Sequence, residues 1–203
     1  ELQPFFVVYG PIRRHLLCAF LAAGVFPPVA ASTPRRAGPA GPALLTLTGA
    51  VRPNCGPLDP ALDQMMAKQQ IAFDRAHTFD FAAPAALPAT TIRPTLEHDA
   101  RPHTLRGPLL ADVLAAAGAP ADGATPLALR AIDGYRVPIT LAEARRLGLI
   151  VATHLDGAPM PLGGLGPLWA VLDADRIPEL AANPLPERFA QCPWGLYPVA
   201  VGA

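Results

Sequence analysis

The sequence is poor in lysine and has no excess of charge of either sign. Its 203 residues include 16 Lys or Arg and 16 Asp or Glu, and Lys68 is the only lysine. Proteins that bind nucleic acid or anionic lipid usually present a clustered basic surface. We therefore expect no nucleic-acid partner for this chain.

Long apolar runs are also absent. The longest near the N-terminus, residues 16–26, is too short to cross a bilayer comfortably. It follows Arg13 and Arg14 and precedes small residues at 29–31, which is the order found in an export signal. The pattern fits either the general secretory route or the twin-arginine route.

Three segments follow from this pattern. We predict a targeting segment over residues 1–31, within which the residues before 11 would fit a misread start. Residues 32–42, rich in Ala, Pro and Gly, are expected to be a linker, and residues 43–203 a single domain. The location indicated is the periplasm, with no transmembrane anchor once the signal is removed.

Cysteine is scarce, with three in the chain. Removal of the signal would remove Cys18 and leave Cys55 and Cys192 near opposite ends of the domain. In an oxidising compartment the two could form a disulfide that closes a long loop. The alternative left open by the sequence is two unpaired thiols.

Proline and glycine are abundant, with 26 and 17 residues, but they alternate with apolar residues in a chain that is 51% hydrophobic. They therefore punctuate short elements instead of indicating disorder. We predict strands at 43–51, 77–81, 89–98, 149–157, 166–173 and 192–201, and a hairpin or bent strand at 130–139 around Asp133-Gly134. Pro94 limits the strand at 89–98 to an edge or a bulge. Helical segments are predicted at 60–73, at 108–118 with Gly118 as C-cap, at 140–148 with Thr140 and Glu143 as a capping box, and at 175–184. This order is typical of an α+β fold with mixed sheets and a few short helices, and unlike a parallel doubly wound sheet.

A polar cluster stands out at Glu97, His98, Asp99 and His103. Imidazole and carboxylate groups at close spacing can ligate zinc or iron. The spacing matches no strong metal-binding motif, so we predict no metal site. The preferred interpretation is an exposed turn at the mouth of a pocket. Farther along the chain, His154 and Asp156 close a strand, and His154 is expected to be structural.

Several segments, taken in order, resemble the molybdopterin-binding domain of the sulfite oxidase family, in particular its small exported single-domain members. The segments are "LTLTGAV", "FDFAAPAALPATTIRPTLEH", "HTLRGPLLADVLAAAGA", "LDGAPMPL" and "GPLWAVLD". The resemblance covers residues 43–203. It implies an α+β domain that holds a pterin-bound molybdenum through one cysteine thiolate.

The chain departs from that family where the metal is held. The position of the cysteine falls at or next to Thr95, and residues 91–106 contain no cysteine. A threonine hydroxyl stays protonated at neutral pH and is a poor substitute for a soft thiolate. Pro161 stands where family members often have an arginine. Catalytic residues are therefore not assigned.

The resemblance also suggests which residues would line the cavity: Arg93, Thr95, His98, Arg101 and His103. Arginine forks match phosphate geometry, so Arg93, Arg101 and Arg106 could meet a pterin phosphate. Solvated surface charges are the alternative for each of them.

Two functions remain open from the sequence. The favoured one is a cofactor-free module that uses the cavity to bind a small molecule or a periplasmic protein. The alternative is an active molybdopterin-dependent oxidoreductase that transfers an oxygen atom and passes electrons to a separate partner.

Overall fold

The computed structural model describes residues 39–202 of the chain. These residues fall within one compact unit, 34–203. The predicted targeting segment, 1–31, and most of the predicted linker lie outside the described residues. Among residues 39–202, no helix is both long and apolar enough to cross a membrane.

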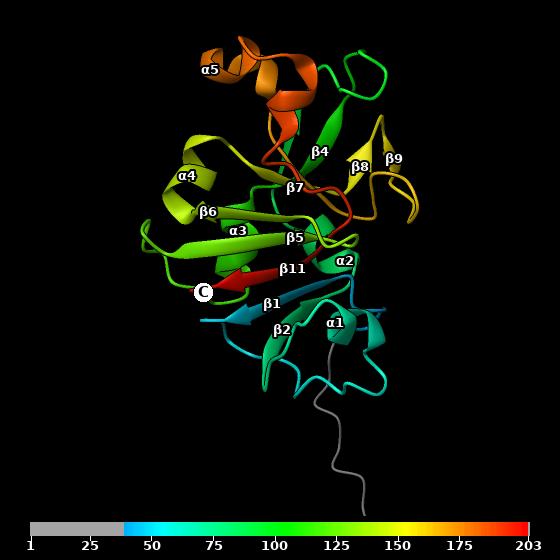
Figure 1. The fold of residues 1–203 in the computed structure, drawn as a ribbon, viewed down its shortest axis with the longest axis vertical. Coiled ribbons are helices and arrows are strands. Elements are labelled where there is room, and N and C mark those ends of the chain that lie inside the picture. Colours follow the sequence, from blue (N-terminus) through cyan, green and yellow to red (C-terminus); the bar gives the residue numbers. More distant parts are fainter. Residues whose placement is uncertain (1–38, 203) are drawn as a thin grey trace, which may run out of the picture. The chain divides into compact units, whose positions relative to one another are not determined.

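The domain is mixed α+β, as the sequence predicts, with several sheets and a few short helices (Figure 1). The larger sheet has five strands in the order β2 (Ala76–Phe79), β1 (Leu45–Gly49), β11 (Leu196–Val201), β5 (Pro126–Ala131) and β6 (Arg136–Thr140). In this sheet β1 and β11 run parallel, and the other neighbours are antiparallel. The prediction against a parallel doubly wound sheet is thus confirmed.

A smaller sheet carries the polar cluster of the sequence. Its strands, in order, are β3 (Ala89–Ile92), β4 (Leu105–Pro108), β8 (His154–Leu155) and β9 (Ala158–Pro159). A separate antiparallel pair is formed by β7 (Ile150–Ala152) and β10 (Trp169–Val171). Because β3 is an edge strand, Pro94 just beyond it removes no ladder hydrogen bond, as expected from its position in the sequence.

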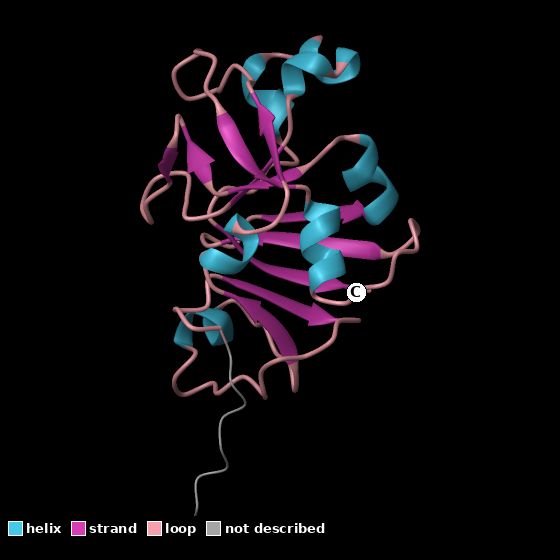
Figure 2. Ribbon diagram, turned by 180° about the vertical axis from the view of Figure 1, so that it is seen from behind, coloured by secondary structure: helices cyan, strands magenta, loops and turns pink. Residues whose placement is uncertain are grey.

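The helices are short. They are α1 (Gln64–Lys68), α2 (Ala82–Ala85), α3 (Leu110–Ala116), α4 (Leu141–Arg146) and α5 (Pro178–Ala181), with 3-10 turns η1 (Ala174–Arg176) and η2 (Leu185–Phe189). Figure 2 shows α2 and α3 on one face of the larger sheet. Leu45, Leu47 and Leu129 are fully buried on this side.

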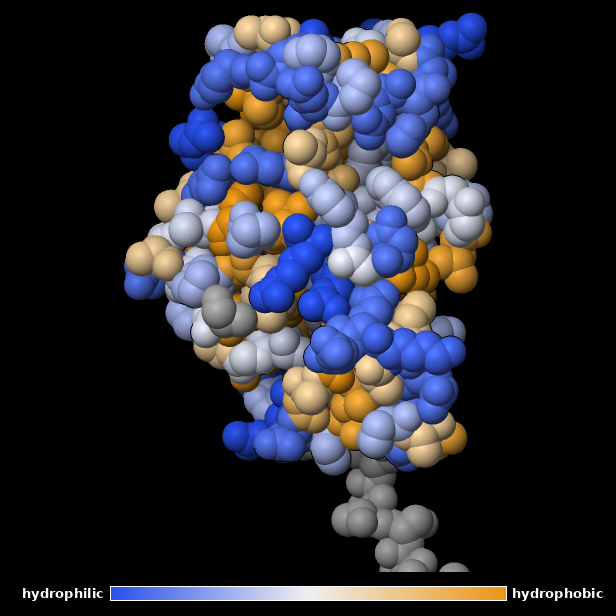
Figure 3. Space-filling view, viewed as in Figure 1, coloured by the Kyte–Doolittle hydropathy of each residue, from blue (hydrophilic) through white to orange (hydrophobic). Residues whose placement is uncertain are grey.

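The opposite face of the larger sheet is mixed. Side chains alternate along a strand, and this face carries buried Thr46 and Ala128 as well as charged residues. Arg130 is half-buried and Arg136 exposed, and the two are paired across β5 and β6. Figure 3 shows hydrophilic side chains across the middle of the molecule on the side seen in Figure 1. The large apolar side chains of this sheet thus lie mainly on the face that carries Leu45, Leu47 and Leu129.

Local signals in the sequence predict several element boundaries correctly. The Thr140 hydroxyl accepts a hydrogen bond from Glu143 N at 3.2 Å and caps the start of α4. Gly118, with φ of 72°, follows the end of α3. The turn at Asp133 and Gly134 joins β5 to β6 as expected.

The prediction of a helix over 60–73 is wrong for most of its length, since only Gln64–Lys68 is helical. Asp59 accepts a hydrogen bond from Ala61 N at 2.8 Å and favours a turn there. At the other end, Gln70 has a left-handed φ of 57°. No residue of α1 is buried, so no tertiary packing extends this helix.

The structure also corrects the start of the next helix. Pro108 is the last residue of β4, and α3 begins at Leu110. Gly107 is needed here for close packing, because a Cβ atom at this position would collide with the carbonyl oxygen of Val151 in β7. The Gly-Pro pair therefore marks a packed strand instead of a helix start.

The predicted disulfide between Cys55 and Cys192 is not formed. Cys55 is bridged to Ala76, where β2 begins, and its Sγ donates to the Ala76 carbonyl oxygen at 3.3 Å. Cys192 is buried in the core, and its carbonyl oxygen accepts a hydrogen bond from the Trp169 indole at 2.9 Å. The two thiols thus belong to different parts of the packing.

Candidate functional site

The loop between β3 and β4 carries most of the residues singled out in the sequence. Its two sides are held together by a bridge between Thr95 and Pro102 and by a hydrogen bond from Leu96 N to the Arg101 carbonyl, 2.9 Å. Because β8 pairs with β4, the turn between β8 and β9 lies beside the same loop.

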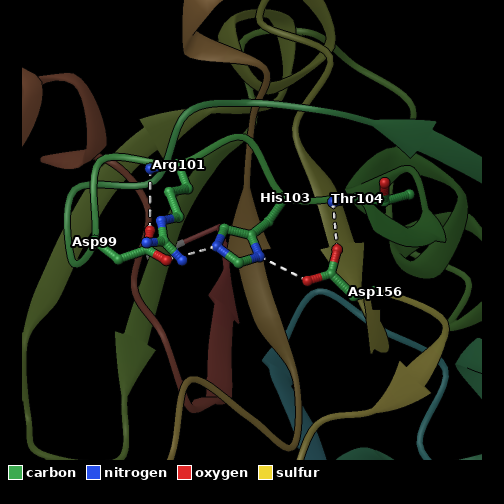
Figure 4. A network of polar contacts seen from close by, with 5 residues as sticks. All are labelled: Asp99, Arg101, His103, Thr104 and Asp156. Atoms are coloured by element: carbon green, nitrogen blue, oxygen red, sulfur yellow. Dashed lines mark hydrogen bonds and ion pairs between the residues drawn. The ribbon is translucent and has the colours of Figure 1, made fainter.

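His103 connects this loop to that turn. Its Nδ1 lies 2.6 Å from Oδ2 of Asp156, and its Nε2 lies 2.9 Å from Oδ2 of Asp99 (Figure 4). The second oxygen of each carboxylate accepts a backbone N–H, from Thr104 at 2.8 Å and from Arg101 at 3.1 Å. We call His103, Asp99 and Asp156 the histidine clamp.

The clamp favours the charged imidazolium, because only that form donates from both nitrogens. The hydrogen bond to Asp156, followed by the one to Asp99, raises the pKa of His103. In turn, hydrogen bonding from His103 lowers the pKa of both Asp99 and Asp156. The three groups together therefore favour a state with one positive and two negative charges.

Local sequence explains how Asp156 reaches His103. Asp156 and Gly157 form the two-residue connection between β8 and β9, with φ values of 49° and 86°. Aspartate followed by glycine is a preferred pair for a hairpin turn with positive φ at both positions. The Asp-Gly pair thus places a carboxylate at the tip of this hairpin.

A shallow pocket of about 350 Å³ adjoins the loop. Its lining comes from the end of β3, the start of β4 and the region of η1, and consists of Thr91, Ile92, Arg93, Thr104, Asp173, Asp175 and Arg176. Thr104 directly follows His103, so the clamp and the pocket share a wall. Ile92 supplies a buried apolar floor.

Asp175 ties the pocket to the loop and to η2. Its Oδ2 accepts the Thr95 N–H at 2.7 Å, and its Oδ1 accepts from Nη1 of Arg188 at 3.0 Å. Burial alone would raise the pKa of Asp175. The hydrogen bonds from the backbone and side chain of Thr95 and from Arg188 outweigh that effect and hold the pKa below its ordinary value.

The structure brings together some of the predicted site residues and separates others. Arg93 lines the pocket, and His103 lies next to it within the clamp. Thr95 stands at the margin, tied to Asp175 but not lining the pocket. His98 and Arg101 are exposed on the loop, and the closest charged group to His98 is Glu97 at 4.0 Å.

Sequence reasoning missed Asp156, Asp173, Asp175 and Arg176 as members of this region. The acidic pair and Arg176 follow β10 in "LDADR", about eighty positions after Arg93. A hydrogen bond from Arg93 N to Asp173 Oδ2, 3.4 Å, spans that separation. No local sequence pattern predicts this contact, because it depends on how the segment after β3 and the segment after β10 pack together in the fold.

Cys192 is distant from Thr95 in sequence but close to the loop in space. A hydrogen bond from the Leu172 backbone reaches its thiol, and Glu97 lies near enough to act on it electrostatically. Burial raises the pKa of Cys192 to about 12, with a smaller contribution from Glu97 in the same direction. The thiol is therefore protonated at any physiological pH.

Within residues 39–202, no group of three or more His, Cys, Asp or Glu side chains is arranged to hold a metal ion. The members of the polar cluster form two separate pairs. Asp99 pairs with His103, and Glu97 lies closest to His98.

The fold and the pocket define a mixed α+β domain with a polar surface pocket beside its smaller sheet. A comparison with models of protein families finds no match for the chain, and a comparison with curated proteins finds none.

Proposed function

We propose that the chain is an exported, cofactor-free binding module built on the fold of the sulfite oxidase molybdopterin-binding domain. The support for the fold is the order of segments in the sequence together with the mixed α+β architecture. The observation that carries the proposed function concerns Thr95, which stands at or next to the position of the metal-binding cysteine in that family. Thr95 has a hydroxyl in place of a thiolate and is engaged by a neighbouring acidic residue. Its N–H donates to a carboxylate, Asp175, at 2.7 Å.

The donor groups near Thr95 do not suit a molybdenum held by a thiolate. The hydroxyl of Thr95 cannot replace a soft thiolate. Cys192, on which Glu97 of this loop acts, is buried, and burial raises the pKa of its thiol to about 12. A metal ligand must be deprotonated, and both the Thr95 hydroxyl and the burial of Cys192 oppose this.

The charges of the pocket are of both signs. Asp173 and Asp175 line it together with Arg93 and Arg176, so a cofactor with only negative charge would be attracted by one part of the lining and repelled by the carboxylates. One of the two is balanced by Arg188, whereas no ion pair compensates Asp173 within the described residues. The pocket better suits a ligand that is not purely anionic.

The decisive experiment is the molybdenum and pterin content of the chain purified from the periplasm of a host that loads its other molybdoenzymes. We expect a folded protein with less than about 0.05 molybdenum and pterin per chain. One molybdenum and one pterin per chain would refute the proposal and favour the alternative, an active oxygen-atom-transfer enzyme with a separate electron partner.

A further inference from the structure

The pocket beside β3 contains hydrogen-bonding groups that the chain itself does not use. Within residues 39–202, the guanidinium groups of Arg93 and Arg176 make no hydrogen bond or ion pair. The hydroxyls of Thr91 and Thr104 also have no hydrogen-bond partner there. Two exposed arginines and two threonines, whose side-chain donors have no partner in the described part of the chain, therefore line the same pocket.

The two arginines reach the pocket from different elements, Arg93 from the end of β3 and Arg176 from η1. A planar guanidinium pairs best with a carboxylate or another oxyanion, to which it can donate two parallel hydrogen bonds. An oxyanion between the two forks would gain charge-assisted bonds from both sides.

The two acidic side chains of the pocket differ in how many hydrogen-bond donors they have. Asp175 is saturated by Thr95 and Arg188. Asp173 accepts one long bond from Arg93 N, 3.4 Å, on Oδ2, and its buried Oδ1 has no donor in the described part of the chain. A buried carboxylate oxygen without a donor is destabilising unless a partner is supplied. The Asp173 carboxylate therefore keeps the capacity to accept from a cationic donor on a ligand in the pocket.

We propose that this pocket binds a small zwitterion, with its oxyanion between Arg93 and Arg176 and its ammonium group at Asp173. This inference rests on the proposed function, because it assigns a ligand class to the same cofactor-free pocket. The volume of about 350 Å³ is at the lower end for small-molecule sites. A compact amino acid or an amine-bearing organic phosphate therefore fits the size and the charges.

The experiment is an NMR titration of the periplasmic chain, ¹⁵N-labelled, with three probes that differ by one charged group. β-Alanine carries a carboxylate and an ammonium, propionate only the carboxylate, and propylamine only the ammonium. We expect β-alanine to shift the amides of residues 91–95, 104 and 173–176. Its dissociation constant should be at least about fivefold lower than that of either other probe. Phosphoethanolamine in a parallel titration distinguishes a phosphate from a carboxylate ligand.

Variants test the individual contacts. Arg93→Gln and Arg176→Gln should each weaken β-alanine binding by about tenfold, the loss expected for a charge-assisted hydrogen bond. Asp173→Asn should reduce β-alanine affinity to that of propionate. Arg136→Gln, on the exposed part of β6, is the matched control and should leave both affinities unchanged.

Several outcomes would overturn the inference. They are shifts by none of the probes, equal affinity for β-alanine and propionate, and an Asp173→Asn variant that still discriminates between them. These outcomes leave the proposed function standing, because that proposal is judged by molybdenum and pterin content. A chain that contains the cofactor would fail the first test irrespective of the titration.

Discussion

The larger sheet and the smaller sheet share one apolar core but differ in their charged contacts. Leu45, Leu47 and Leu129 are fully buried beside the larger sheet, and Leu105 is fully buried in the smaller one. The smaller sheet in addition has charged hydrogen bonds between its loops, through the histidine clamp and through Asp175. Burial of apolar surface is insensitive to pH, whereas bonds between titrating groups are not.

This difference separates stability from candidate function. The five-stranded sheet supplies large buried side chains to the core, and none of its residues lines the candidate pocket. The smaller sheet contributes Thr91, Ile92, Arg93 and Thr104 to the pocket. Substitutions in the first region should therefore change folding, and those in the second should change binding or pH response.

The largest expected effect is in the apolar region. Leu129→Ala, at a fully buried position of β5, should lower the free energy of unfolding by about 2–5 kcal/mol, since it removes buried methyl groups and leaves a cavity. Urea unfolding followed by circular dichroism measures this. Leu62→Ala, at a side chain that is 80% exposed, is the control and should change it by less than about 0.5 kcal/mol. Equal effects of the two would contradict the assigned core.

A smaller loss is expected where β4 of the smaller sheet packs against β7. Gly107→Ala would place a methyl group against the carbonyl of Val151, and overpacking of this kind costs about 1–3 kcal/mol. Gly56, which has open space around its Cβ position, provides the matched control as Gly56→Ala. If thermal unfolding shows the same midpoint for both variants, β4 does not pack against β7 as described.

The histidine clamp should make stability depend on pH. The folded pKa of His103 lies above its unfolded value of about 6.5. Its contribution is therefore complete below that value and is lost as the pH rises through the folded pKa. Asp99 and Asp156 have folded pKa values below about 3.9. Their contribution is present above that value and is lost as the pH falls through the folded pKa.

The clamp is thus fully effective between about pH 4 and pH 6.5. Urea midpoints from pH 4 to pH 9 should decline on the alkaline side in the unmodified chain, and His103→Gln should flatten this decline. His98→Gln, on the same loop but 4.0 Å from its closest carboxylate, should leave the profile unchanged. Parallel profiles for the chain and the His103 variant would show that the clamp contributes nothing.

The smallest effect concerns the buried thiol. Cys192, with a pKa of about 12, should not react with iodoacetamide at pH 8 in the folded chain and should react after denaturation. Peptide mass spectrometry of the alkylated chain measures this directly. Rapid labelling of native Cys192 would indicate an accessible thiolate and would restore it as a candidate metal ligand.

The sequence predicted most elements because their signals are local. Alternation of apolar residues identified β1, the Asp133-Gly134 pair identified the turn before β6, and Thr140 with Glu143 identified the start of α4. The predicted range 130–139 missed most of β5, Pro126–Ala131. The same method overextended the helix at 60–73, since helix-forming residues there lack a surface to pack against. For the site, it found Arg93 and His103, which share one short segment.

What the sequence determined by itself is the α+β class, the neutral charge and the absence of cysteine from residues 91–106. Only the tertiary structure decided that β11 lies beside β1, that Asp156 meets His103, and that Asp173 and Arg176 join Arg93 at one pocket. The physical reason is the separation of the contacting residues along the sequence. Propensity, capping and turn chemistry act over a few residues, whereas these contacts join residues tens of positions apart and form only when the sheets pack.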